Sequence, residues 1–328
     1  MNIYIHLEVS AREFDSKLLL AVVAASRGHE VLISDQESII KGLKRKLLTP
    51  GIFHTKSLTP GKFKIIKHDE LIRLGCKITS IDEEGGLVDY GYEKFVKLRY
   101  SSKTINQASA VFAWGPEDYK SLKKNYPNYS KKIFMTGSPR ADLWRPFFWD
   151  YWKKNFKKPK KPFLLVSSNL GGGLSYKTFN ERIRHLEKGE YIKRDPAILK
   201  KTIIKESEQS MLINHFVEAI QYLAHKNKNY KIILRPHPSE NIDTWKIFFD
   251  TTPNVSVIRE EAISLWIRNT FAILHNGCTT ALEASFAKKP IITFAPFAAK
   301  YSRELANDLG QKVKSLKELS NKVNIFFN

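Results

Sequence analysis

Short runs of β-forming residues alternate with helical segments along almost the whole chain, and this alternation constrains the fold more than any other feature. The strand-like runs lie at residues 2–7, 29–34, 77–81, 110–114, 132–136, 163–168, 231–235, 255–258, 271–275 and 290–295. The helical segments lie at residues 14–27, 60–74, 116–125, 207–226, 260–268 and 280–287. Because strands that alternate with helices form parallel sheets with helices on both faces, the pattern predicts an α/β fold of doubly wound, Rossmann-like sheets.

The first forty residues contain the clearest strand–helix–strand unit. The pattern 10-SARE-13 predicts a capping box, in which Ser10 and Glu13 satisfy each other's backbone amides at the start of a helix. Gly28 follows the helix and is expected to end it in a left-handed conformation.

The length of 328 residues favours about two domains. The segment 144–162 separates them, because it mixes seven aromatic residues, seven basic residues and three prolines. We therefore expect an N-terminal domain at 1–145, an aromatic and basic linker at 146–162, and a C-terminal domain at 163–328. A return of the last helix onto the N-terminal domain is an alternative for the end of the chain. The default active site of such a chain is the cleft between the two domains.

Charge and cysteine content narrow the function classes. The formal net charge of +21 favours anionic partners such as phosphorylated substrates, membrane surfaces or nucleic acid, although a lysine-rich surface also produces it. The longest apolar run, 18–25, is too short to span a bilayer, and no signal peptide is visible. Two distant cysteines predict neither disulfides nor a cysteine metal site. We expect a cytoplasmic protein.

The stretch 231-KIILRPHPSE-240 is the first candidate site. A predicted strand ends at Arg235, and His237 follows between Pro236 and Pro238. Each proline fixes φ and removes an amide donor, so the histidine is presented on a stiff turn. A rigid imidazole beside an arginine suits a phosphate oxygen; an ordinary surface turn is the structural alternative.

The stretch 271-FAILHNGCTTALEAS-285 is the second candidate. A strand runs into Gly277, and a helix is expected to begin near Thr280, where unpaired amides and the helix dipole favour a phosphate. Thr279 and Thr280 add hydroxyl groups, and Glu283 is placed to accept the hydroxyls of a ribose. The alternative is that 280-TALE-283 is a capping box. His275 is interpreted as a structural residue.

The stretch 163-FLLVSSNLGGG-173 is the third. Ser167, Ser168 and Asn169 end the first strand of the C-terminal domain, and three glycines follow. Glycine turns allow close approach of the backbone to a ligand. The segment is not a P-loop, because it lacks the Gly-Lys-Ser/Thr ending.

The stretch 82-DEEGG-86 places three carboxylates, Asp82, Glu83 and Glu84, at the end of a strand in the N-terminal domain. A carboxylate among like charges has a raised pKa, which suits a general base. The alternative is a solvated acidic turn, although the turn is unusual in so basic a chain.

Together these motifs resemble two-domain GT-B glycosyltransferases, with the domains facing each other across a cleft. The order 83-EEG-85, 237-HP-238 and 279-TT-280 resembles bacterial sialyltransferases and related enzymes that use CMP-activated sugars. The segments 11–21, 82–85, 113–118 and 136–142 resemble bacterial surface carbohydrate biosynthesis proteins. The threonine pair departs from the serine-rich third motif of the sialyltransferase-like enzymes.

The resemblance implies roles for individual residues. Glu83 would be the base, followed by Glu84 and then Asp82, or a carboxylate would be the nucleophile in a retaining reaction. His237 would contact the donor phosphate with help from Arg235. The remaining donor-binding residues would be Pro238, Ser167, Ser168, Asn169, Gly277, Thr279, Thr280 and Glu283. Glu8, Arg12 and Arg140 would lie on the acceptor side. No metal or other cofactor is expected, since no Asp-x-Asp motif is present.

The leading hypothesis is the transfer of a 3-deoxy-ulosonic sugar, Kdo or a sialic-like nonulosonate, from a CMP donor to a bacterial surface glycan. Its partners would be a nucleotide-sugar donor, a glycan or lipid-linked glycan acceptor, and an anionic membrane contacted peripherally through 144–162, but no nucleic acid. The alternatives are a polyol-phosphate transferase of the CDP-glycerol type, a sugar-nucleotide epimerase of the same fold, and a non-enzymatic basic protein that binds membrane surfaces.

Overall fold

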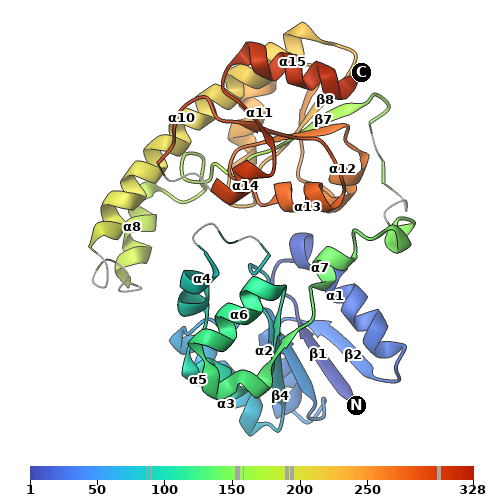
Figure 1. Cartoon of the computed structure of the whole chain (residues 1–328), viewed down its shortest axis with the longest axis vertical. Coiled ribbons are helices and arrows are strands. Elements are labelled where there is room, and N and C mark those ends of the chain that lie inside the picture. The colour runs from blue at the N-terminus through green and yellow to red at the C-terminus, as the bar shows by residue number, and fades with distance from the viewer. Residues whose placement is uncertain are drawn as a thin grey trace. The chain divides into compact units, whose positions relative to one another are not determined.

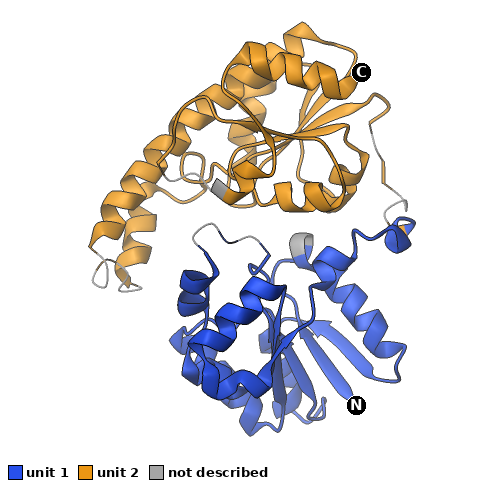
Figure 2. Ribbon diagram, in the orientation of Figure 1, with its two compact units in different colours: residues 1–150 blue, residues 151–328 orange. Residues whose placement is uncertain are grey.

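The structure is a computed structural model, and it describes residues 1–86, 88, 91–151, 156–157, 159–188, 192, 196–300 and 304–328, without the side chains of Ala11, Arg12 and Glu304. The chain forms two compact units, residues 1–150 and 151–328 (Figure 2). The division falls inside the predicted linker 146–162, of which residues 152–155 and 158 lie outside the described residues.

The first unit is built on a six-stranded parallel sheet of order β2-β1-β3-β4-β5-β6 (Figure 1). Its strands are β1 (Asn2–His6), β2 (Glu30–Ser34), β3 (Ile52–Thr55), β4 (Lys77–Ile81), β5 (Ala108–Ala113) and β6 (Ile133–Met135). Its helices are α1 (Ser10–Ala25), α2 (Gln36–Lys44), α3 (Lys62–Arg73), α4 (Tyr92–Arg99), α5 (Ser102–Gln107), α6 (Pro116–Asn125) and α7 (Pro139–Asp142), with 3-10 turns at η1 (Pro127–Lys132) and η2 (Pro146–Phe148).

The second unit repeats this plan with the order β12-β11-β10-β7-β8-β9, again all parallel. Its strands are β7 (Phe163–Ser167), β8 (Lys231–Arg235), β9 (Val255–Val257), β10 (Ala272–His275), β11 (Ile291–Phe294) and β12 (Gln311–Val313). Its helices are α8 (Phe179–Lys188), α10 (Ala197–Lys226), α11 (Ile242–Phe249), α12 (Ile263–Asn269), α13 (Thr280–Phe286), α14 (Glu304–Asp308) and α15 (Leu316–Phe327).

Each unit has its own hydrophobic core. In the first unit the core gathers Tyr4, Phe53, Ile78 and Val111 from four neighbouring strands. In the second unit the strand residues pack against α10, α11 and α15, and the last helix contributes Leu319 and Val323 to this core. The two parallel sheets with flanking helices confirm the predicted α/β fold class.

Local expectations had mixed outcomes. Gly28 has φ +80°, which confirms its left-handed conformation. The predicted capping box is wrong, because α1 begins one residue earlier with Val9 as its N-cap, which makes no side-chain hydrogen bond. Glu13 is instead buried, and its carboxylate accepts a hydrogen bond from the Glu8 amide at 3.2 Å. The sequence also did not predict β3 or β12.

Candidate functional site

The strand order of the second unit identifies where a ligand is expected. β7 is flanked by β8 on one side and β10 on the other, so the connections from β7 diverge at its carboxyl end. Ligands of open α/β sheets bind in the crevice at such a switch point. In this unit the crevice lies beside Ser168 and Asn169, which follow β7, and beside Asn276 and Gly277, which follow β10.

Hydrogen bonds join the two sides of this crevice. The Asn169 side-chain amide donates to the Gly277 carbonyl at 2.8 Å, and the Gly277 N–H donates to Asn307 Oδ1 at 2.7 Å. Gly277 has φ +62°, in the left-handed region that favours glycine. His275 is buried and contacts Thr293, and burial lowers its pKa to about 4, which agrees with the structural role predicted for it.

His237 is exposed on the turn after β8, next to the exposed Pro238. Its Nδ1 accepts a hydrogen bond from the Ser239 N–H at 3.2 Å and contacts the Ser239 hydroxyl at 2.8 Å. Because the backbone N–H can only donate, Nδ1 carries no proton in the neutral ring, and the proton sits on Nε2. The turn therefore presents a histidine whose Nε2 is a hydrogen-bond donor in both protonation states.

Glu240 anchors this turn, and no motif in the sequence marks it as a site residue. Its carboxylate is fully buried and accepts three hydrogen bonds: from Ser168 Oγ at 2.6 Å, from Trp245 Nε1 at 2.7 Å and from the Leu170 N–H at 2.7 Å. Burial raises the pKa of Glu240, while these three donors favour its ionised form. The Glu240 N–H also donates to the His237 carbonyl at 2.8 Å, so one residue ties the loop after β7 to the histidine turn.

Arg235 has a different role from the one predicted. Its buried guanidinium donates to the backbone carbonyls of residues 259–261, at 3.1 Å for Arg259 and 2.8 Å for Glu261. It also lies 5.6 Å from the Trp266 ring centroid, and burial lowers its pKa to about 10. Arg235 therefore holds the 259–261 loop, and its guanidinium is not directed at a phosphate as predicted.

The remaining predicted donor-binding residues surround the same crevice. Ser167 is buried between β8 and β10, and its hydroxyl has no hydrogen-bond partner among the described residues. At the start of α13, Thr280 donates to Cys278 Sγ at 3.0 Å, and Glu283 is buried within the first turn. The capping-box alternative required Thr280 as the N-cap, and it is wrong because Thr279 is the N-cap of α13 and Thr280 is its first helical residue.

The three glycines after β7 are packed closely against other side chains of the same unit. A Cβ on Gly171, Gly172 or Gly173 would overlap Ser239, Gln209 or Ile213, respectively. Gln209 of α10 accepts from the Gly172 N–H at 2.6 Å and donates to the Asn169 carbonyl at 3.1 Å. The glycines thus allow α10 to close on the loop, and close approach of a ligand is not needed to explain them.

A cavity of about 600 Å³ adjoins this loop and lies within the size range of small-molecule sites. Asn169 and Ser239 line it together with residues of α8 and α10, which lie side by side (Figure 1) and are joined by an Arg182–Glu206 ion pair. Its other basic lining residues are Lys177, His185 and Lys205. The cavity is therefore cationic and starts at the serine that holds His237.

In the first unit, the acidic turn after β4 is not a cluster of like charges. Asp82 is 1% exposed, and both of its oxygens accept from Arg99, at 2.8 Å each. Burial raises the pKa of Asp82, and Arg99 opposes that effect. The Asp82 carbonyl accepts from Trp114 Nε1 at 2.7 Å, and a Cβ on Gly86 would come within 2.5 Å of the same ring. Asp82 is therefore a structural residue, and its candidacy as a base is withdrawn.

The two glutamates of the turn differ in exposure. Glu83 is 7% exposed and forms an ion pair with Lys17 of α1, which is also buried. Glu84 is half-buried, and its N–H donates to Asp82 Oδ1 at 3.0 Å. The pKa of Asp82 is raised, as expected for this turn, but burial is the main cause and the charge of Glu84 adds only a smaller effect. The chain also supplies a cation for each of the two buried carboxylates.

The crevice of the first unit lies between β1 and β3, where connections again diverge. Lys56, which follows β3, contacts Glu8 at 2.6 Å and the buried Glu13 at 3.6 Å. The Lys56 hydrogen bond lowers the pKa of Glu8. The side chain of Arg12 lies outside the described residues, and Arg140 is half-buried at the start of α7, where its N–H donates to Ser138 Oγ at 3.3 Å.

Three histidines beneath this crevice are buried and neutral. Burial and the charge of Lys64 lower the pKa of His6 and that of His68 to about 4. Burial, with a smaller effect of Lys17, lowers the pKa of His54 to about 3. Its Nδ1 lies 2.9 Å from Thr79 Oγ1.

Among the described residues, no three His, Cys, Asp or Glu side chains come together as a set that could hold a metal ion. No helix in the described part of the chain has the length and apolar character needed to cross a membrane.

No protein-family model matches the chain, and no curated protein matches its sequence. Solved structures share its fold over its full length. They include UDP-GlcNAc 2-epimerase from Methanocaldococcus jannaschii in complex with UDP-GlcNAc and UDP, with TM-score 0.56, 15% identity and coverage of 100% of this chain and 93% of that chain.

Two others are UDP-GlcNAc 2-epimerase from Neisseria meningitidis bound to UDP-GlcNAc (TM-score 0.52, 11% identity, 100% of this chain and 91% of that chain) and S. aureus MnaA with UDP (TM-score 0.55, 12% identity, 100% and 87%). At such low identities the similarity establishes the fold, which is the GT-B type with two Rossmann-like units.

Proposed function

We propose that this chain is an enzyme that processes nucleotide sugars, with the nucleotide and its phosphates bound by the second unit. One observation carries the proposal: His237 is presented on a braced turn at the carboxyl edge of the sheet, next to a cationic cavity of about 600 Å³. The whole-chain similarity to structures that hold UDP or UDP-GlcNAc supports it.

In the proposed site His237 acts on the phosphate of the leaving nucleotide. Ser239 holds Nδ1 as an acceptor, so Nε2–H donates to a phosphate oxygen as negative charge develops on it. Thr279, Thr280 and Glu283 at the neighbouring crevice are proposed to contact the nucleoside. Lys177 in the cavity supplies positive charge for further anionic groups.

Glu83 and Glu84 remain the proposed proton-transfer residues of the first unit. Both follow β4 at the carboxyl edge of that sheet, and Lys17 holds the Glu83 carboxylate in place. An approach of these carboxylates to His237 across a cleft stays a prediction.

For the reaction, we propose first the interconversion of a UDP-linked N-acetylhexosamine at carbon 2. The fold similarity to UDP-GlcNAc 2-epimerases, at TM-scores of 0.52 and 0.56, favours this over transfer. The second candidate is transfer of a 3-deoxy-ulosonic sugar from a CMP donor. It is supported by the ordered 83-EEG-85, 237-HP-238 and 279-TT-280 elements and by the cations of the cavity, which suit a sugar that carries a carboxylate.

One panel of substrates separates the candidates. UDP-GlcNAc is incubated in D₂O and followed by proton NMR, because inversion at carbon 2 by proton removal and return replaces its hydrogen with deuterium. CMP-Kdo and CMP-nonulosonates are followed by CMP release with glycan acceptors, and CDP-glycerol by product mass.

His237→Ala should lower kcat/KM for the active substrate by about 10²–10³-fold, as expected when a donor to the reacting oxygen is lost. His215→Ala, which changes a histidine of α10 outside the site, should leave it unchanged. Absence of turnover with every substrate, or full activity of His237→Ala, would refute the proposed function.

A further inference from the structure

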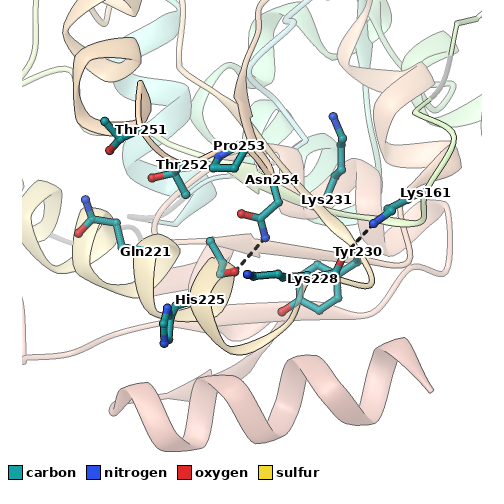
Figure 3. A pocket seen from close by; sticks show the side chains of 11 residues that line it. Lys161, Gln221, His225, Lys228, Tyr230, Lys231, Thr251, Thr252, Pro253 and Asn254 are labelled. Atoms are coloured by element: carbon teal, nitrogen blue, oxygen red, sulfur yellow. Dashed lines mark hydrogen bonds between the residues drawn. The ribbon is translucent and has the colours of Figure 1, made fainter.

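A second cavity of the second unit, of about 580 Å³, opens at the opposite edge of the sheet from His237. Figure 3 shows the residues that line it. Lys161 lies just before β7, Lys231 begins β8, and Asn254 immediately precedes β9. Since the strands are parallel, these positions all lie at the amino-terminal edge. The end of α10, with Gln221 and His225, completes the wall.

The charges that line this cavity are all of one sign. Lys161, Lys228 and Lys231 carry them, and none of the eleven lining residues is Asp or Glu. Lys228 and Lys231 form no ion pair with any described residue. The other lining groups include the hydroxyls of Thr251 and Thr252, so the wall offers hydrogen-bond donors together with positive charge.

Short-range contacts hold this arrangement in place. Lys161 Nζ donates to the Lys228 carbonyl at 3.0 Å, which joins the segment before β7 to the turn before β8 (Figure 3). The Asn254 amide donates to the carbonyls of Ala224 and Asn227 at 3.0 and 3.3 Å. An uncharged side chain therefore already satisfies carbonyls at the end of α10, and the ammonium groups of Lys228 and Lys231 are not needed for that purpose.

We propose that this cavity is an anion site that binds a phosphate group, separate from the candidate site at the carboxyl edge. Lysine ammonium groups bind phosphate as point charges, and several of them without a counter-charge create a positive potential that only an anion relieves. The open mouth admits either a soluble phosphate or the headgroup of an anionic lipid. This proposal is independent of the reaction catalysed at the other edge.

The test compares the full-length protein with two triple variants of equal net charge. Lys161→Ser/Lys228→Ser/Lys231→Ser removes the cavity lysines, and Lys200→Ser/Lys317→Ser/Lys322→Ser removes three lysines of the same unit that do not line the cavity. The probes are inorganic phosphate and pyrophosphate, followed by calorimetry, and phosphatidylcholine vesicles with and without phosphatidylglycerol, followed by co-sedimentation.

The cavity variant should bind anionic vesicles about 100-fold more weakly, at roughly fivefold for each lysine near a charged surface, and should lose saturable binding of the soluble anions. The control variant should stay within about threefold of the wild type, and Lys161→Arg/Lys228→Arg/Lys231→Arg should retain binding. Binding of vesicles alone identifies a lipid headgroup, and binding of the soluble probes identifies a free phosphate.

Two results would overturn the proposal. One is the absence of saturable binding of every probe by the wild type. The other is an equal loss in both serine triples, since that would reflect overall charge. Far-ultraviolet circular dichroism and the melting temperature of each variant establish that it is folded. If the serine triple variant is unfolded, the arginine triple variant tests the site.

Discussion

Replacement of Glu240 by Gln tests the proposed anchor of the histidine turn. Gln has the same shape, but one of its two terminal atoms is a donor, whereas all three partners of Glu240 are donors. Two of them, Ser168 and Trp245, share Oε2, and the Leu170 N–H alone uses Oε1. The amide nitrogen should therefore take the Oε1 position and leave the buried Leu170 N–H without an acceptor.

The loss of stability follows from the one hydrogen bond that is lost, the bond from the Leu170 N–H. A buried donor left unpaired costs about 1–3 kcal/mol, and the two remaining bonds lose their charge assistance. Removal of a buried charge offsets part of this loss. We expect Glu240→Gln to destabilise the second unit by about 2 kcal/mol, which corresponds to roughly 4–8 °C in melting temperature for a unit of this size.

Thermal unfolding and amide hydrogen exchange together check this prediction. The Leu170 amide should exchange markedly faster in Glu240→Gln, since its acceptor is lost. The matched control is Glu218→Gln, which alters a carboxylate that is 59% exposed and should change stability by less than about 0.5 kcal/mol. A Glu240→Gln protein that melts within 1 °C of the wild type with a protected Leu170 amide would show that the carboxyl group is protonated and that the reasoning is wrong.

Three further predictions concern buried groups outside the histidine turn. Arg99→Met should destabilise the first unit by about 3–5 kcal/mol because it leaves Asp82 buried without its partner, and adding Asp82→Asn should recover much of that loss in urea unfolding. His54 is neutral in the folded protein, with a pKa near 3, so its contribution to the free energy of unfolding is complete above pH 6.5 and is lost as the pH falls. Between pH 6.5 and 5 the free energy of unfolding should fall by roughly 2 kcal/mol more in the wild type than in His54→Gln. Gly172→Ala should cost about 1–3 kcal/mol through overlap with Gln209, and a double-mutant cycle with Gln209→Ala should show a coupling of at least 0.5 kcal/mol if that overlap is the cause.

The strand–helix alternation predicted both sheets, because it depends on local periodicity and on breaks such as Gly28. β3 escaped prediction for a local reason. Its four residues include His54 and Thr55, whose burial depends on the neighbouring strands, so no apolar run marks it in the sequence. The site residues were also predictable only where their position depends on local sequence. The position of His237 at a strand end follows from local pattern, whereas the acceptor role of Glu240 depends on Ser168, 72 residues away.

Residue type alone also led us to expect ligand contacts from some side chains that instead form contacts within the protein. Arg235 and Asp82 are polar groups at the carboxyl edges of strands, which is where ligands bind, yet both are consumed by protein contacts. A buried charge is costly without a partner, and for both of these side chains other groups of the protein supply the partner. The pairing of Asp82 with Arg99 joins residues 17 positions apart and has no signature in the sequence.

The Lys17–Glu83 pair determines for which substrates we expect Glu83 to move a proton. If Glu83 accepted a proton, Lys17 would become a buried charge without its partner, at a cost of about 3–5 kcal/mol. That cost disappears only if an anionic group of the substrate comes close enough to replace the Glu83 carboxylate. We therefore expect Glu83 to act as a base on a substrate whose negative charge reaches Lys17, and Lys17 to oppose that role for a neutral acceptor.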